Sequence, residues 1–216
     1  MPNENSNEVS LKELRKGFYK YRSFEIFNLW QRSLILTAFS ILCFTAYGFL
    51  VSGLLNADSP TKLLVMNEIA CGAALFGLSF AVLWIMMAKG SKAWYEVYER
   101  YICDIEMEER NGVEIPEHYR LGALCEPWEL DSNLFSKKAG RYSPSRLNIM
   151  TGMLLFIMWI TIFAFHYAAS IVYFLKADAV CRVQLPVLLF IPVVLLTILI
   201  TAVRNTWGRS RSLVKP

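Results

Sequence analysis

The chain contains few of the residues that usually carry chemistry. Its 216 residues include two histidines and five cysteines, and no two cysteines form a CxxC pair. Structural zinc sites and disulfide frameworks need such residues at regular spacings, so we expect neither. The sequence also has no nucleophile elbow, glycine-rich phosphate loop, HExxH motif or pair of carboxylates within an apolar block. We therefore predict a non-enzymatic protein without a catalytic residue, cofactor or metal.

Charge is almost absent from four long apolar blocks, at residues 33–55, 67–88, 147–175 and 183–203. Apolar residues make up 55% of the chain, and the mean hydropathy is +0.37. A helix of about 20 apolar residues crosses a hydrocarbon core of about 30 Å. The blocks therefore predict an all-α integral membrane protein with four transmembrane helices.

Long connections outside the membrane are also absent. The stretches between the first two blocks and between the last two have room only for short turns, which excludes an external receptor or ligand-binding domain. No small-residue cleavage site follows the first block, so we expect it to act as an uncleaved signal.

The positive charges lie mostly on one side of this arrangement. Residues 1–32, 89–146 and the tail carry 19 of the 22 Lys and Arg residues, and the two short connections carry three. By the positive-inside rule, both termini and the central segment are cytoplasmic. The net charge of +4 does not indicate nucleic-acid binding, because 11 of the 18 acidic residues are interleaved with the bases of the central segment.

These observations predict five segments. They are a cytoplasmic N-terminal helix over 1–32, a transmembrane hairpin over 33–88, a cytoplasmic helical segment over 89–146, a second hairpin over 147–203 and a tail over 204–216. The first segment is amphipathic, and it either lies at the membrane interface or binds a partner.

The second span is predicted to continue past Gly90 as one long helix to about residue 110, because a single glycine does not end a helix. Beyond Gly90 an apolar, mostly aromatic stripe recurs at helical spacing. It comprises Trp94, Val97, Tyr98, Tyr101, Ile102 and Ile105. Residues 11–21, the segment after residue 112 or the same helix of another subunit must cover it. We predict that it packs a cytoplasmic collar in a homo-oligomer. The acidic run over 104–109 is expected to be solvated.

Small residues form one face of the second span, at Ala70, Ala73, Ala74, Gly77 and Ala81. Membrane helices associate closely through such faces, so we predict a helix contact here.

Two titratable residues belong to the spans. His166 lies well inside the third block, and we interpret it as an interhelical hydrogen-bonding residue or as part of a polar path. Glu68 lies at the edge of the second block. It is expected to be solvated or paired with Lys62, with a pore-mouth carboxylate as the alternative.

Basic residues flank the spans on the predicted cytoplasmic side. Lys89, Lys92, Lys137, Lys138 and Arg141 are expected to contact anionic lipid headgroups.

Two motifs resemble a known family. "GSKAWYEVYERYICDIE" (residues 90–106) and "YSPSRLNIMTG" (residues 142–152) resemble signatures of the RipA family of small bacterial inner-membrane proteins. The residues that match are Ser91, Lys92, Trp94, Glu99, Ser145, Asn148 and Ile149. Pro144 departs from the pattern. The resemblance implies an octameric assembly in the bacterial inner membrane with cytoplasmic termini, and it supplies no reaction.

Three functional hypotheses follow. The first is a homo-oligomeric scaffold or pore-like assembly, a candidate channel, with a cytoplasmic collar. The second is a regulatory or adaptor subunit that binds a cytosolic protein through residues 112–146, and the third is a membrane enzyme. The expected partners are lipid, further copies of the chain and a cytosolic protein, with no nucleic acid.

Overall fold

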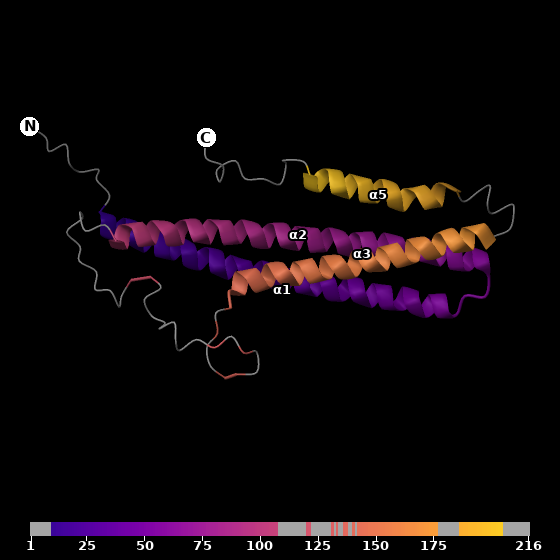
Figure 1. Ribbon diagram of the computed structural model, residues 1–216, viewed down its shortest axis with the longest axis horizontal. Helices are drawn as coiled ribbons and strands as arrows, with labels where there is room; N and C mark the ends of the chain where they lie inside the picture. The colour runs from indigo at the N-terminus through magenta and orange to yellow at the C-terminus, as the bar shows by residue number, and fades with distance from the viewer. Residues whose placement is uncertain are drawn as a thin grey trace, which may run out of the picture. The chain divides into compact units, whose positions relative to one another are not determined.

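The computed structural model of the chain describes residues 10–107, 120–121, 131, 133, 136–137, 140, 142–176 and 186–204. The regular structure among them is entirely helical, as predicted. It consists of α1 (Leu11–Leu55), α2 (Pro60–Met107), α3 (Pro144–Lys176) and α5 (Pro186–Arg204) (Figure 1).

The two longest helices pass beyond the apolar blocks. α1 is a single helix of 45 residues, so the amphipathic N-terminal stretch and the first span are continuous. α2 has 48 residues and runs through Gly90 without interruption, which confirms the predicted continuous helix. The predicted end of this helix near residue 111 lies outside the described residues.

Proline marks the start of three helices, at Pro60, Pro144 and Pro186. A proline in the first turn removes only an N–H group that would have no helical partner. Pro192, by contrast, lies inside α5.

Three helices, α1, α2 and α3, are long and apolar enough to cross a membrane. The apolar stretch of α5 that the structure describes, Phe190–Val203, is shorter. The four-span count therefore stays a prediction.

The chain divides into two compact units. Unit 1 comprises Met1–Gln31 and Ala88–Leu147, and unit 2 comprises Arg32–Met87 and Asn148–Pro216. The assignment of segments to the membrane or the cytoplasm stays a prediction.

The core of unit 2 lies between α1, α2 and α3. Trp159 of α3 is 1% exposed, and its ring stacks on Phe44 of α1 at a centroid distance of 4.6 Å. Ala74, Leu78 and other small or branched residues of α2 complete this core. Leu196 and Leu199 bring α5 against it.

Candidate functional site

The aromatic stripe of α2 is covered in unit 1 by the N-terminal part of α1. Phe18 stacks on Tyr101 with ring centroids 5.2 Å apart and an interplanar angle of 11°, and Tyr21 packs against Tyr98 at 5.9 Å. Ile102 is fully buried. Of the three expected covers, residues 11–21 of the same chain are the one observed here. Tyr101 stays 51% exposed.

The predicted stripe residues thus lie at a contact within one chain. Trp94 extends the contact through Tyr98, with centroids 6.2 Å apart, and Val97 and Ile105 are half-buried. Their role in contacts between subunits stays a prediction.

Two arginines of α1 fix the same pair of helices by charge. Arg22 donates from Nε to Oε1 of Glu99 at 2.8 Å, and both side chains are about one-third exposed or less. Arg15 donates from Nε and Nη2 to Oε1 of Glu106 at 2.8 and 2.6 Å. The two ion pairs lie two helical turns apart, so they set the register of α1 against α2.

Glu106 is the most completely hydrogen-bonded carboxylate among the described residues. Besides Arg15, the Tyr19 hydroxyl donates to Oε1 at 3.0 Å, and the Leu121 N–H donates to Oε2 at 2.7 Å. Its side chain is 1% exposed. The expectation that the whole acidic run is solvated is therefore wrong at Glu106, because four donors replace water around this carboxylate.

These donors also determine how Glu106 ionises. Burial alone would raise its pKa, but the Leu121 N–H, the Arg15 guanidinium and the Tyr19 hydroxyl together outweigh burial. The pKa of Glu106 is therefore lower than usual. The pKa of Tyr19 is raised, first by burial and then by its hydrogen bond to this carboxylate.

Several residues of the two family-like motifs hold helices together. In unit 1, Ser145 at the start of α3 forms a hydrogen bond with Tyr95 of α2. In unit 2, Asn148 accepts a bond from Trp84 Nε1 at 2.6 Å and donates to Ser33 Oγ at 2.6 Å. Asn148 therefore links α1, α2 and α3. Ser91 is buried and Ile149 is half-buried.

We expect Asn148→Ala to destabilise unit 2 by about 1–2 kcal/mol, because it leaves Trp84 Nε1 without its acceptor inside an apolar helix bundle. Thermal unfolding of the purified protein in detergent measures the change. Asn56→Ala is the matched control, because the Asn56 side chain is exposed and bonds only the carbonyl of Ser52, four residues earlier in α1. Equal unfolding temperatures for the two variants would contradict the assigned role.

The small-residue face of α2 receives Trp159. A Cβ at Gly77 would lie 2.3 Å from Cε2 of the Trp159 ring. Ala70, Ala74 and Ala81 are buried on the same helix, and Ala73 is half-buried. The lack of a side chain at Gly77, among neighbours that carry only a methyl group, lets the Trp159 ring lie against the α2 backbone.

His166 lies in a hydrogen-bonded chain that joins three helices of unit 2. The Tyr47 hydroxyl of α1 lies 2.8 Å from Nε2, and Oδ1 of Asn67 on α2 lies 2.7 Å from Nδ1. Since an amide oxygen only accepts, Nδ1 carries the proton and the Tyr47 hydroxyl donates to Nε2. Asn67 in turn donates to the Leu63 carbonyl at 2.7 Å. With a neutral ring, both imidazole nitrogens therefore have a hydrogen-bond partner.

Sequence reasoning missed Tyr47 and Asn67. Asn67 is the one side-chain amide in the blocks at 33–55 and 67–88. That isolated amide was the available signal, since such a group needs a partner inside apolar surroundings.

Glu68 follows Asn67 on α2 and is also buried, but it does not take part in the His166 hydrogen-bonded chain. It is 9% exposed, and Oε1 is buried without a hydrogen-bond partner in the part of the chain that the structure describes. Lys62 bonds the Asn56 carbonyl instead, at 3.4 Å. The expectation of a solvated or Lys62-paired carboxylate is therefore wrong, because Glu68 points into the bundle rather than toward the helix start.

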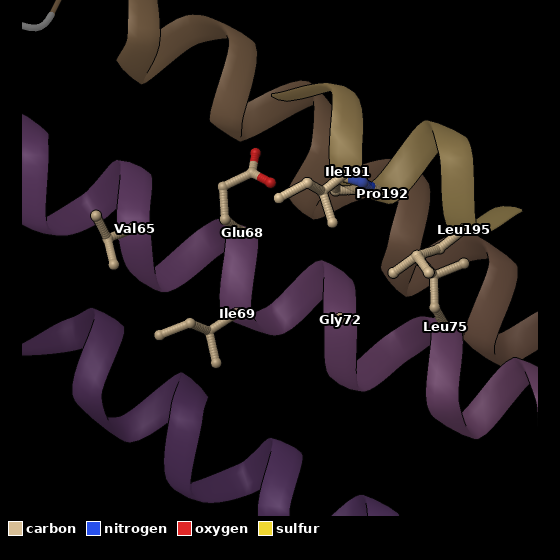
Figure 2. Close-up of a pocket in the computed structure, with 8 residues that line it drawn as sticks. All are labelled: Val65, Glu68, Ile69, Gly72, Leu75, Ile191, Pro192 and Leu195. Carbon is tan, nitrogen blue, oxygen red and sulfur yellow. The ribbon is translucent and has the colours of Figure 1, made fainter. Parts of the chain in front are cut away.

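A pocket of about 190 Å³ opens beside Glu68 between α2 and α5. Its other lining residues are apolar or glycine, including Ile69, Ile191, Pro192 and Leu195. Figure 2 shows the Glu68 carboxyl extending from α2 toward the side occupied by Ile191 and Pro192.

The predicted headgroup contacts are only partly described. Lys89 and Lys137 are exposed, and Lys92 forms an ion pair with Glu96 four residues along α2. Lys138 and Arg141 lie outside the described residues. Lipid contact stays a prediction for all five.

Within the described ranges, no three His, Cys, Asp or Glu residues lie close enough together to hold a metal ion. The absence of a metal, a cofactor and an enzymatic activity remains an expectation from the sequence.

The comparison with protein families gives a match. The model of the octameric membrane protein family matches residues 12–168. This range includes both family-like motifs and most of α1, α2 and α3. No curated protein and no solved structure matches the chain significantly.

Proposed function

The chain belongs to the octameric membrane protein family, and on this premise we propose that it is a structural subunit of a homo-oligomeric scaffold. Membership and the apolar helices make it a membrane protein that self-associates. The scaffold role, as opposed to a conducting pore or an enzyme, is our proposal.

One observation carries this choice: the polar side chains that join the helices of unit 2 point inward, and most of its exposed surface is apolar. His166, Asn67 and Asn148 bond to neighbouring helices of the same chain. Exposed threonines such as Thr45 and Thr161 donate to the carbonyl four residues earlier in their own helices. Large apolar side chains dominate the exposed surface, among them Leu34, Phe49, Phe165 and Phe190.

An ion pathway between subunits needs polar or charged groups along its wall. The described parts of α1, α2, α3 and α5 inside the predicted spans place no charged side chain on their exposed surface. That surface suits lipid tails and tight packing against further copies, because membrane helices associate by close van der Waals contact. The geometry therefore favours an assembly that organises the membrane over one that conducts ions.

The finer parts of the proposal are an octamer like those implied by the RipA resemblance, four spans, a bacterial inner-membrane location and cytoplasmic termini. The distribution of Lys and Arg supports the orientation. The compact contact of α1 with α2 in unit 1 supports a cytoplasmic collar, because Tyr101 and Met107 remain exposed on it for packing between subunits.

Native mass spectrometry of the full-length protein in non-ionic detergent tests the assembly. We expect a complex of eight 24.8 kDa chains. A monomer would contradict the proposal. The same preparation in liposomes is expected to pass no potassium or chloride above the protein-free level, and sustained ion flux would favour a pore instead.

A second candidate, the adaptor subunit, has one supporting observation. The Leu121 N–H donates a hydrogen bond to Glu106 of α2 at 2.7 Å, so one residue of the 112–146 stretch is joined to α2 within unit 1. Deleting residues 122–135 would then leave the oligomer intact and remove a co-purifying protein. If no protein co-purifies with the full chain, this candidate fails.

A further inference from the structure

We propose that the pocket between α2 and α5 binds a cationic amphiphile, namely an ammonium group with at least one N–H attached to a hydrocarbon chain. This inference goes beyond the scaffold role, because it assigns a ligand to a site inside unit 2. It rests on Glu68, on the composition of the pocket wall and on the exposed apolar rim.

One carboxylate oxygen of the buried Glu68 side chain has no hydrogen-bond partner among the described residues. The side chain is more than nine-tenths buried, and the oxygen without a partner is Oε1. Ser170 of α3 lies against it, and the Ser170 hydroxyl oxygen is likewise buried without a partner of hydrogen-bonding geometry. Buried polar atoms in native structures almost always have a partner, so this pair indicates a missing group.

The pocket wall selects the chemical class of that group. Glu68 provides the one side chain with hydrogen-bonding atoms in the pocket lining. Calcium or magnesium needs about six oxygen ligands, which this wall does not supply. An anion would meet a carboxyl group and no donor. An ammonium N–H needs only one acceptor and also complements a negative charge.

The exposed apolar residues at the rim of the pocket provide the contact surface for the hydrocarbon chain of the proposed ligand. Ile69, Ile191 and Leu195 line the pocket and are 52%, 46% and 46% exposed, so apolar surface continues outward from the carboxyl group. Glu68 follows Pro60 by eight residues, or about 12 Å along the helix axis, which places it in the first third of the α2 stretch of unit 2. A ligand with a cationic end at Glu68 and an alkyl chain along the rim fits this arrangement (Figure 2).

Two sources share this chemistry, an aminophospholipid and a free lipophilic amine. The first experiment uses dodecyldimethylamine, which is protonated at pH 7, and dodecanol as its neutral counterpart. Binding to the full-length oligomer in non-ionic detergent is measured by calorimetry. We expect the amine to bind about tenfold to a hundredfold more tightly than the alcohol, as for a hydrogen bond to a charged group.

Three variants locate the binding. Glu68→Gln keeps the size of the side chain and loses the charge, so it should reduce amine binding to the level of dodecanol. Leu195→Trp should fill the pocket and weaken both ligands while leaving Glu68 in place. Asp58→Asn removes an exposed carboxylate just before α2 and should leave binding unchanged. Equal binding of the amine to Glu68→Gln and the unchanged protein would overturn the proposal.

Nanodiscs distinguish the two sources. Discs of phosphatidylcholine alone and discs that also contain phosphatidylethanolamine are analysed by native mass spectrometry after the lipid is stripped. If the unchanged protein retains phosphatidylethanolamine and the Glu68→Gln variant does not, the site binds lipid. Amine binding without such retention assigns it to a free amine.

The same spectra give the subunit number. An intact oligomer that binds neither the amine nor phosphatidylethanolamine would overturn this proposal and leave the scaffold standing. Loss of the oligomer in Glu68→Gln, with no amine binding by the unchanged protein, would instead assign the carboxyl group to a subunit contact and also overturn it.

Discussion

Glu106→Gln is expected to destabilise the contact between α1 and α2 in unit 1 by about 3 kcal/mol. Breaking a buried ion pair costs about 3–5 kcal/mol, and we take the lower end because the Arg15 side chain is 30% exposed. The glutamine retains one acceptor oxygen, but its NH₂ group would face donors from Arg15, Tyr19 or Leu121. Neutral glutamine therefore cannot satisfy all four bonds.

Hydrogen exchange with mass spectrometry measures this effect. We expect residues 11–22 and 95–107 to exchange roughly a hundredfold faster in the variant, since about 1.4 kcal/mol corresponds to a factor of ten. Asp104→Asn is the control, because Asp104 lies two residues away on the same helix and is exposed. If both variants exchange like the unchanged protein, Glu106 does not hold the two helices together.

The pH dependence of the same contact follows from the lowered pKa of Glu106. A carboxyl group with a lower pKa in the folded than in the unfolded state stabilises the fold above the unfolded value of about 4.3. That contribution is lost as the pH falls through the folded value. Exchange protection in unit 1 should therefore be level between pH 5 and 7, after correction for intrinsic exchange, and should fall below about pH 4. Glu106→Gln should remove most of this acid dependence.

Gly77→Ala is the second change with a large expected effect, about 1–3 kcal/mol of destabilisation from overpacking. The added Cβ would lie 2.3 Å from Cε2 and 2.4 Å from Cδ2 of Trp159. The ring has little freedom to move, because Phe44 stacks on it and Tyr47 meets it edge-on at 6.0 Å. The clash should exceed the gain of about 1 kcal/mol that alanine brings to a helix.

Gly72→Ala provides the matched control. Gly72 lies five residues earlier on α2, and a Cβ there would meet nothing within 4 Å. Thermal unfolding in detergent should show a lower midpoint for Gly77→Ala and an unchanged or higher midpoint for Gly72→Ala. The double variant with Gly77→Ala and Trp159→Leu should be destabilised by less than the sum of the two single variants, because the smaller leucine leaves room for the added Cβ. A midpoint for Gly77→Ala at or above that of Gly72→Ala would contradict the close approach.

Local sequence patterns were sufficient for the helices. Uncharged apolar blocks and the lack of a break at Gly90 predicted α2 as one continuous helix, and the small residues around Gly77 predicted a helix contact. These features repeat within one or two helical turns, so periodicity shows them directly. The same patterns did not reveal that α1 is continuous from Leu11, because the change from an amphipathic to an apolar pattern near residue 32 was interpreted as the boundary between two segments.

The sequence by itself determined an all-helical membrane protein with an aromatic stripe beyond its second apolar block. Only the tertiary structure decided what each face meets. It placed Phe18 over the stripe, buried Glu106 under Arg15, joined His166 to Tyr47 and left Glu68 facing an apolar pocket. Arg15 and Glu106 are 91 residues apart, and Tyr47 and His166 are 119 apart. Helical periodicity defines the faces of one helix, whereas the packing of several helices determines which faces meet and which polar groups find partners.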